Sequence, residues 1–168
     1  KLFTFKGDKS ATPAIVDLTD VVVYEDNVAS PVYGKEPEYV LKTEDGTATS
    51  RIVTTNLEYN YQYLDTDSAT LDLITEYTVA AGVNVTDNGT PTNVSNWIVT
   101  DPATTGQTIK SKVFYWDNNI GTPIDESKRT KWALSYKDGL EDTRTDYYYV
   151  AGTEKLVYYT LTYDVKGL

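Results

Sequence analysis

Residues 144–165 read RTDYYYVAGTEKLVYYTLTYDV, and this stretch decides the fold class. Every second residue from Val157 to Val165 is Val, Tyr or Leu, which places these side chains on one face of an extended chain. Such a period of two is typical of a β-strand. The run at residues 145–150 is joined to this strand by a short connection containing Gly152, which favours an antiparallel hairpin. We expect this hairpin to form the centre of a single β domain.

The same alternation recurs along the chain. Residues 51–64 and 71–79 alternate between apolar or aromatic and polar side chains, which predicts two long strands of an antiparallel sheet. Polar turn residues predict a turn at 44–47, an exposed loop or hairpin end at 82–96 and an acidic loop at 137–144. The whole pattern indicates nine to ten strands. The predicted fold is all-β, an antiparallel jelly-roll-like β-sandwich.

Length and charge restrict the partners of the chain. Its 168 residues suffice for one domain with a proper core. The formal net charge is −10, which repels phosphate backbones and anionic lipid surfaces, so we expect neither nucleic acid nor membrane insertion. No run approaches the ~20 apolar residues that span a bilayer. The first residue is Lys1 rather than Met, which indicates either removal of a leader or a shortened sequence; from the first we expect a mature exported protein.

The chain contains no Cys, no His and no Met. Sites built on thiolates or imidazole are therefore excluded, and the absence of the most readily oxidised side chains suits hot or oxidising extracellular surroundings. Carboxylates are the remaining catalytic option, and Glu58 and Glu76 on neighbouring predicted strands are the candidate pair for glycoside hydrolysis. Two solvated glutamates explain the same pattern, and we expect no enzyme activity.

The N-terminal residues 1–6, KLFTFK, form a short alternating strand, and the polar stretch that follows ends at a proline. One interpretation is an edge strand that folds back on its own sheet. The other is a donor strand, in which Leu2, Phe3, Thr4 and Phe5 complete the sheet of a neighbouring subunit. We therefore divide the chain into an extended arm, residues 1–13, and a β-sandwich body, residues 14–168.

Acidic turns make calcium the expected ligand, because Ca²⁺ takes carboxylate and carbonyl oxygens from flexible loops. No twelve-residue EF-hand loop is present, and a solvated acidic turn is the alternative at each position. The candidate ligands lie in two loops and are Asp65, Asp67 and Asp72, and Asp138, Glu141 and Asp142.

Two further features concern sugars. Asn84, Asn88 and Asn93 each begin an Asn-x-Ser/Thr triplet within one predicted loop, which predicts glycosylation of an exported protein. Exposed aromatic side chains at strand spacing are candidates for a sugar-stacking platform, although burial in a core or subunit interface is the commoner use of such residues. These residues are Tyr59, Trp116, Tyr147, Tyr148, Tyr149 and Tyr158. A carbohydrate-binding or adhesin module is therefore an alternative function.

The apolar strand at residues 1–6, the acidic Tyr- and Thr-rich body and the lack of Cys, His and Met together resemble subunits of archaeal extracellular filaments. The chain is most similar in character to the proteins that build cannulae, the hollow tubules of hyperthermophilic archaea, and next to strand-donating archaeal pili. This resemblance implies a jelly-roll-like subunit that polymerises with identical copies by inserting its N-terminal strand into a neighbour, with calcium bound within or between subunits. It implies a cell-surface structural protein.

Overall fold

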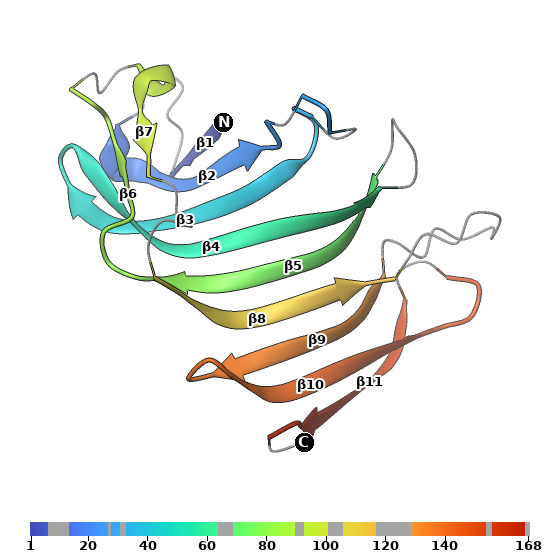
Figure 1. Cartoon of the computed structure of the whole chain (residues 1–168). Helices are drawn as coiled ribbons and strands as arrows, with labels where there is room; N and C mark the ends of the chain where they lie inside the picture. The colour runs from blue at the N-terminus through green and yellow to red at the C-terminus, as the bar shows by residue number, and fades with distance from the viewer. Residues whose placement is uncertain are drawn as a thin grey trace. The chain divides into compact units, whose positions relative to one another are not determined.

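The computed structural model describes residues 1–6, 14–26, 28–30, 33–63, 69–89, 93–100, 106–116, 129–153 and 156–166 (Figure 1). The regular structure in these ranges consists of β-strands and two short 3₁₀ turns. Every strand pair of determined register is antiparallel. The predicted all-β antiparallel class is thus confirmed. Within the described ranges, no helix has the length and apolar character that crossing a membrane requires.

The elements follow the sequence alternation closely. The strands are β1 (Leu2–Phe5), β2 (Leu18–Tyr24), β3 (Pro37–Thr47), β4 (Ser50–Tyr63), β5 (Ala69–Val79), β6 (Asn84–Thr86), β7 (Ile98–Val99), β8 (Gln107–Tyr115), β9 (Thr130–Lys137), β10 (Leu140–Tyr149) and β11 (Val157–Asp164). The 3₁₀ turns are η1 (Ile15–Asp17) and η2 (Val94–Asn96).

The chain forms two compact units. Unit 1 comprises Lys1–Tyr24, Pro37–Leu57 and Tyr77–Thr108, and unit 2 comprises Glu25–Glu36, Glu58–Glu76 and Ile109–Leu168. Strands β4, β5 and β8 each contribute residues to both units.

Unit 1 contains the buried core. Its strands pair in the order β1-β2-β3-β4-β5, with β6 on β4 and β7 on β6. The fully buried side chains include Leu18 and Val21 of β2, Leu41 of β3 and Val53 of β4, and Trp97 joins the same cluster. Removing each such aliphatic side chain from water stabilises the fold by about 1.5–3 kcal/mol.

The predicted exposed loop at 82–96 is wrong in its first half. Val83 and Val85 are fully buried in the core of unit 1, and β6 carries Val85 between β4 and β7. The alternation around β6 extends over too few residues to stand out among the surrounding Asn, Thr and Gly. The core residues of this segment therefore went unrecognised in the sequence.

Unit 2 pairs its strands in the order β4-β5-β8-β9-β10-β11. The predicted C-terminal hairpin is confirmed, with Thr145 opposite Thr162 and Tyr147 opposite Thr160. Its predicted central position is wrong, because β11 is the last strand of the order and all its residues are exposed (Figure 1). Alternation identifies a strand but does not say how many neighbours that strand has.

Two hairpin turns differ from the sequence prediction. The expected turn at 44–47 belongs to β3, and the chain reverses at Ala48 and Thr49. The expected acidic loop at 137–144 is mostly strand, since only Asp138 and Gly139 separate β9 from β10. Both residues have positive φ, 53° and 79°, as a two-residue hairpin turn matched to the sheet twist requires.

Candidate functional site

The four predicted donor-strand residues form β1, which lies antiparallel to β2 of the same chain (Figure 1). Phe3 and Phe5 both meet Trp97 edge-on, with ring centroids 5.5 and 5.8 Å away. Leu2 lies on the opposite face and is 52% exposed. In the single chain, β1 therefore takes the edge position, held by two aromatic side chains and the ladder to β2.

The tether of the predicted arm, residues 7–13, lies outside the described residues. Beyond the tether, η1 supplies the fully buried Ile15 to the core of unit 1. The arm and the body are also joined by backbone, because Lys6 N donates to Asp17 O at 2.7 Å. Thr19 Oγ1 adds a bond of 3.1 Å to the carbonyl oxygen of Thr4.

The first calcium candidate loop is described only in part. Asp65 and Asp67 lie outside the described residues, and Asp72 is an exposed residue of β5. The calcium prediction at this loop stays a prediction.

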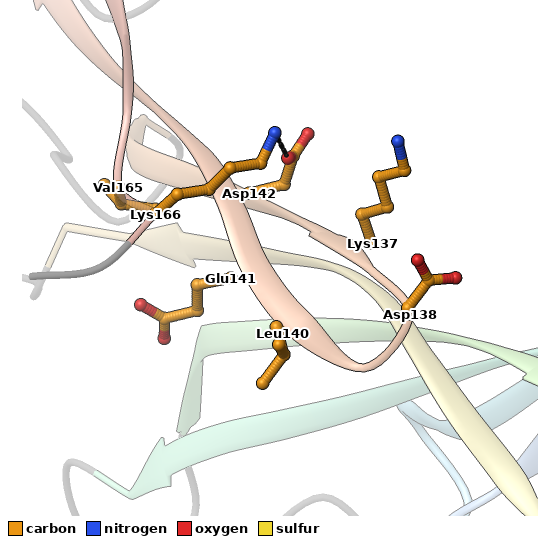
Figure 2. A pocket seen from close by; sticks show the side chains of 7 residues that line it. All are labelled: Lys137, Asp138, Leu140, Glu141, Asp142, Val165 and Lys166. Atoms are coloured by element: carbon orange, nitrogen blue, oxygen red, sulfur yellow. Dashed lines mark ion pairs between the residues drawn. The ribbon is translucent and has the colours of Figure 1, made fainter.

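The second calcium candidate loop lines a cavity of about 530 Å³ at the β9–β10 turn. Figure 2 shows that Asp138 and Glu141 point away from each other, whereas Asp142 faces Lys166. The Asp142 Oδ1 to Lys166 Nζ distance is 2.5 Å, and this ion pair raises the pKa of Lys166. In the ranges that the structure describes, no three Asp or Glu residues lie close enough to hold a metal ion together.

The three glycosylation candidates differ in exposure. Asn88 and Asn93 are exposed, and Asn88 has a positive φ of 49° in the turn after β6. Asn93 Oδ1 accepts hydrogen bonds from the backbone N and the Oγ of Ser95, at 3.3 and 2.6 Å. Asn84 is half-buried on β6. Asn88 and Asn93 thus present the more accessible amides.

The candidate catalytic carboxylate Glu76 already has partners for both oxygens. Its Oε1 accepts from Lys110 Nζ at 2.8 Å and its Oε2 from Ser111 Oγ at 3.0 Å. Both carboxylate oxygens of Glu76 are thus engaged by side chains of β8. The geometry around Glu76 is that of a cross-strand polar contact between β5 and β8.

A second cavity, of about 370 Å³, is lined by residues of β9 and β10 and by the residue that follows β8, all in unit 2, and we call it the aromatic site. It is lined by Trp116, Lys131, Trp132, Arg144, Asp146, Tyr147 and Tyr148. The Arg144 guanidinium lies 3.8 Å from the centre of the Trp132 ring, and Arg144 Nε donates to Asp146 Oδ1 at 2.8 Å. Asp146 Oδ2 accepts from the hydroxyl of Tyr163 at 3.0 Å. Trp132 therefore contacts the Arg144 side of this ion pair, and Tyr163 holds the Asp146 side.

The sequence identified only part of the aromatic site. Trp116, Tyr147 and Tyr148 belong to the predicted aromatic platform, whereas Lys131, Trp132 and Arg144 were not considered. Register brings the missed residues together, since Trp132 lies opposite Asp146 on β10 and Phe114 on β8. The spacing of Arg144, Asp146 and Tyr148, two residues apart on one strand face, was the available signal.

Other members of the predicted platform lie elsewhere. Tyr148 stacks on Tyr159 of β11 with centroids 4.4 Å apart, and Tyr158 is exposed beside Tyr159. Tyr59 and Tyr149 are half-buried in unit 2, and burial raises the pKa of both hydroxyls. The structure therefore brings Trp116, Tyr147 and Tyr148 to one cavity, and Tyr59 is not among the residues that line it.

Comparison of the chain with protein-family models, with curated proteins and with solved structures gives no match. Function is therefore inferred from the side chains and strand edges described above.

Proposed function

We propose that this protein is a structural subunit of an extracellular filament or tubule, in which β1 of one copy pairs with the sheet of the next. The observation that carries the proposal is the attachment of β1. This strand has four residues, lies at the edge of the unit 1 sheet and packs only Phe3 and Phe5 inward. Such an element is suited to exchange between copies, because the same contacts with Trp97 and β2 are remade in the neighbour.

The assembled subunit would use its arm and body as separate parts. Residues 1–13 would leave their own sheet and bridge to the neighbour, while residues 14–168 would form a jelly-roll-like β-sandwich body. Vacating the edge of β2 exposes unpaired backbone donors and acceptors, so each added subunit closes the edge that the previous one opened. This arrangement makes polymerisation self-propagating without catalysis.

Calcium would assist assembly by offsetting repulsion between subunits that each carry a formal charge of −10. The exposed carboxylates at the β9–β10 turn, Asp138 and Glu141, support this role, because both lie at the surface, where they could coordinate a calcium ion shared with another copy. Asp65, Asp67 and Asp72 are the further candidates. The lack of Cys, His and Met agrees with a cell-surface protein of a hot environment. The Asn-x-Ser/Thr triplets at Asn88 and Asn93 agree with a glycoprotein.

The test compares the full chain with a variant lacking residues 1–6, each with calcium and with a chelator. We expect the full chain to form filaments in calcium, seen by negative-stain microscopy and sedimentation, and the shortened chain to stay a folded monomer. Free KLFTFK peptide should cap growing ends and slow assembly of the full chain. Filaments from the shortened chain would contradict the strand-exchange proposal. Assembly that is unchanged by the chelator would contradict the proposed role of calcium.

A carbohydrate-binding module is the second candidate function, and the aromatic site favours it. Trp116 and Tyr148 are exposed, and exposed aromatic rings beside fixed polar groups are the usual composition of sugar sites. The two functions are compatible, since β1 and the aromatic site belong to different units of the chain.

A further inference from the structure

The aromatic site offers a partly exposed indole ring, that of Trp116, beside a fixed polar pair. Trp116 directly follows β8, and its side chain is 37% exposed. The backbone N of Trp116 donates to Arg129 O at 3.0 Å, and this hydrogen bond fixes the backbone from which the side chain projects. Trp132 is largely covered, because Phe114 packs edge-on against its ring at 5.1 Å and Arg144 lies over one face. Trp116 is therefore the ring on which a flat ligand can stack.

The charge of the site differs in sign from that of the chain. Arg144 and Asp146 neutralise each other at 2.8 Å. The Lys131 ammonium lies 4.9 Å from the centre of the Trp116 ring and 5.7 Å from that of Trp132, and the described residues place no carboxylate within ion-pair distance of it. A cation–π contact at an exposed position stabilises an ammonium only weakly, which leaves Lys131 able to pair with an anion.

The size of the site fits a short saccharide. Its volume of about 370 Å³ is at the lower end of the range for ligand pockets, which is about 300–1,000 Å³. A pyranose presents C–H groups on one face, which pack on an indole ring, and hydroxyls at its rim. The Arg144–Asp146 pair provides both donors and an acceptor for those hydroxyls in a fixed geometry.

We propose that the aromatic site binds an acidic saccharide, a uronic-acid unit stacked on Trp116 with its carboxylate paired to Lys131. This inference rests on the second candidate function and not on polymerisation. A neutral sugar would use the ring and the polar pair but leave Lys131 without a counter-ion.

The experiment titrates the full chain with trigalacturonate by isothermal calorimetry, in buffer with a chelator so that calcium cannot bridge protein and ligand. The methyl ester of the same trisaccharide is the matched ligand, because it keeps the stacking face and loses the charge. We expect the acid to bind about two- to fivefold more tightly than the ester, since an ion pair with a partly exposed ammonium contributes a factor of this order.

Three variants locate the binding. Trp116→Ala should weaken binding of the acid by about tenfold or more, and Lys131→Gln should remove the preference for acid over ester while keeping the weak binding of the ester. Tyr33→Ala is the control, because Tyr33 is a 49% exposed aromatic residue of unit 2 outside the site. It should bind like the unmodified chain.

Failure of binding by the acid, equal binding of acid and ester, or equal losses in the Trp116 and Tyr33 variants would each overturn the proposal. Circular dichroism of every variant distinguishes loss of the site from loss of the fold. Removal of residues 1–6 should leave trigalacturonate binding unchanged. Loss of polymerisation and loss of saccharide binding are therefore separable results.

Discussion

Phe3 packs edge-on against Trp97, with the two ring centroids 5.5 Å apart and the ring planes at 76°. This contact ties an edge strand of four residues to the core of unit 1, because Trp97 belongs to the buried cluster. Edge-to-face aromatic pairs contribute about 0.5–1.5 kcal/mol beyond the area they bury. The docking of β1 thus depends on few side chains.

Phe3→Ala should lower the free energy of unfolding by about 1–2 kcal/mol, since a half-buried ring and its contact with Trp97 are lost. Leu2→Ala is the matched control, because Leu2 neighbours Phe3 but is 52% exposed. Its change should stay within about 0.5 kcal/mol. Urea unfolding of both variants at low protein concentration, where copies do not assemble, measures the difference. Equal effects would mean that β1 does not dock on Trp97.

Stability should fall steeply above pH 10. Burial raises the pKa of Tyr61 well above its unperturbed value of 10.0, with Glu36 and Tyr59 adding to the effect, and burial also raises the pKa of Tyr115. Above pH 10 the unfolded chain releases these protons while the folded chain retains them, so the unfolded state binds fewer protons and stability declines with pH. The stabilisation is fully present below pH 10 and is lost as the pH rises through the folded-state pKa values.

Urea midpoints at pH 9, 10 and 11 measure this decline. Tyr61→Phe should make it shallower, because the ionisable hydroxyl is gone, whereas Tyr158→Phe, at a side chain 74% exposed, is the matched control. A decline that is the same in all three proteins would show that Tyr61 does not cause it.

Two glycines should respond to alanine for different reasons. At Gly46, an added Cβ would collide with the carbonyl oxygen of Ser50 and lie 2.8 Å from Arg51 Cα, so β3 and β4 must separate locally. We expect Gly46→Ala to destabilise by about 1–3 kcal/mol. At Gly139 the space is open, but φ is +79°, which disfavours an L side chain by about 1–2 kcal/mol.

A second substitution at each of the two positions distinguishes crowding at Gly46 from backbone strain at Gly139. Gly139→Asn should recover much of the stability lost in Gly139→Ala, because Asn tolerates positive φ. Gly46→Asn should be at least as damaging as Gly46→Ala, because a larger side chain meets the same backbone. Thermal unfolding of the four variants measures this pattern. Recovery at Gly46 would contradict the close approach of β3 and β4.

The calcium response of assembly should depend on the β9–β10 turn. The double variant Glu141→Gln and Asp142→Asn should raise the calcium concentration needed for half-maximal assembly by about tenfold, since two of the proposed carboxylate ligands are removed. The double variant Glu44→Gln and Asp45→Asn is the matched control, because it removes the same charge in a different hairpin. Like Asp142, Asp45 is an ion-paired aspartate, with its Oδ1 3.8 Å from Arg51. Sedimentation against calcium concentration measures both. Equal shifts would indicate general charge neutralisation.

The sequence predicted where the strands lie far better than it predicted which faces of those strands are buried. Alternation located β4 and β5 almost to the residue, but it put Asn56 on a polar, half-exposed face, whereas Asn56 is buried and its Nδ2 donates to Gln107 Oε1 at 3.0 Å. On the same face Ile52 is exposed. A period of two shows which side chains share a face, while the cover of that face comes from distant segments.

The aromatic site was only half visible for a related reason. Trp116 and Tyr148 stood out as aromatic residues on strands, but Trp132 and Arg144 gain their roles from the register between β9 and β10. That register includes a bulge between Glu141 and Thr143, which shifts every later pair by one residue. Sequence spacing alone does not reveal such a shift.

Strand β11 has one further consequence. Among the described residues it pairs only with β10, so alternate amides along Val157–Asp164 have their protons directed to solvent on the outer side. In deuterated water these outward protons would be replaced quickly and the inward ones slowly. This alternation of fast and slow amide exchange would disappear if another strand paired with that edge.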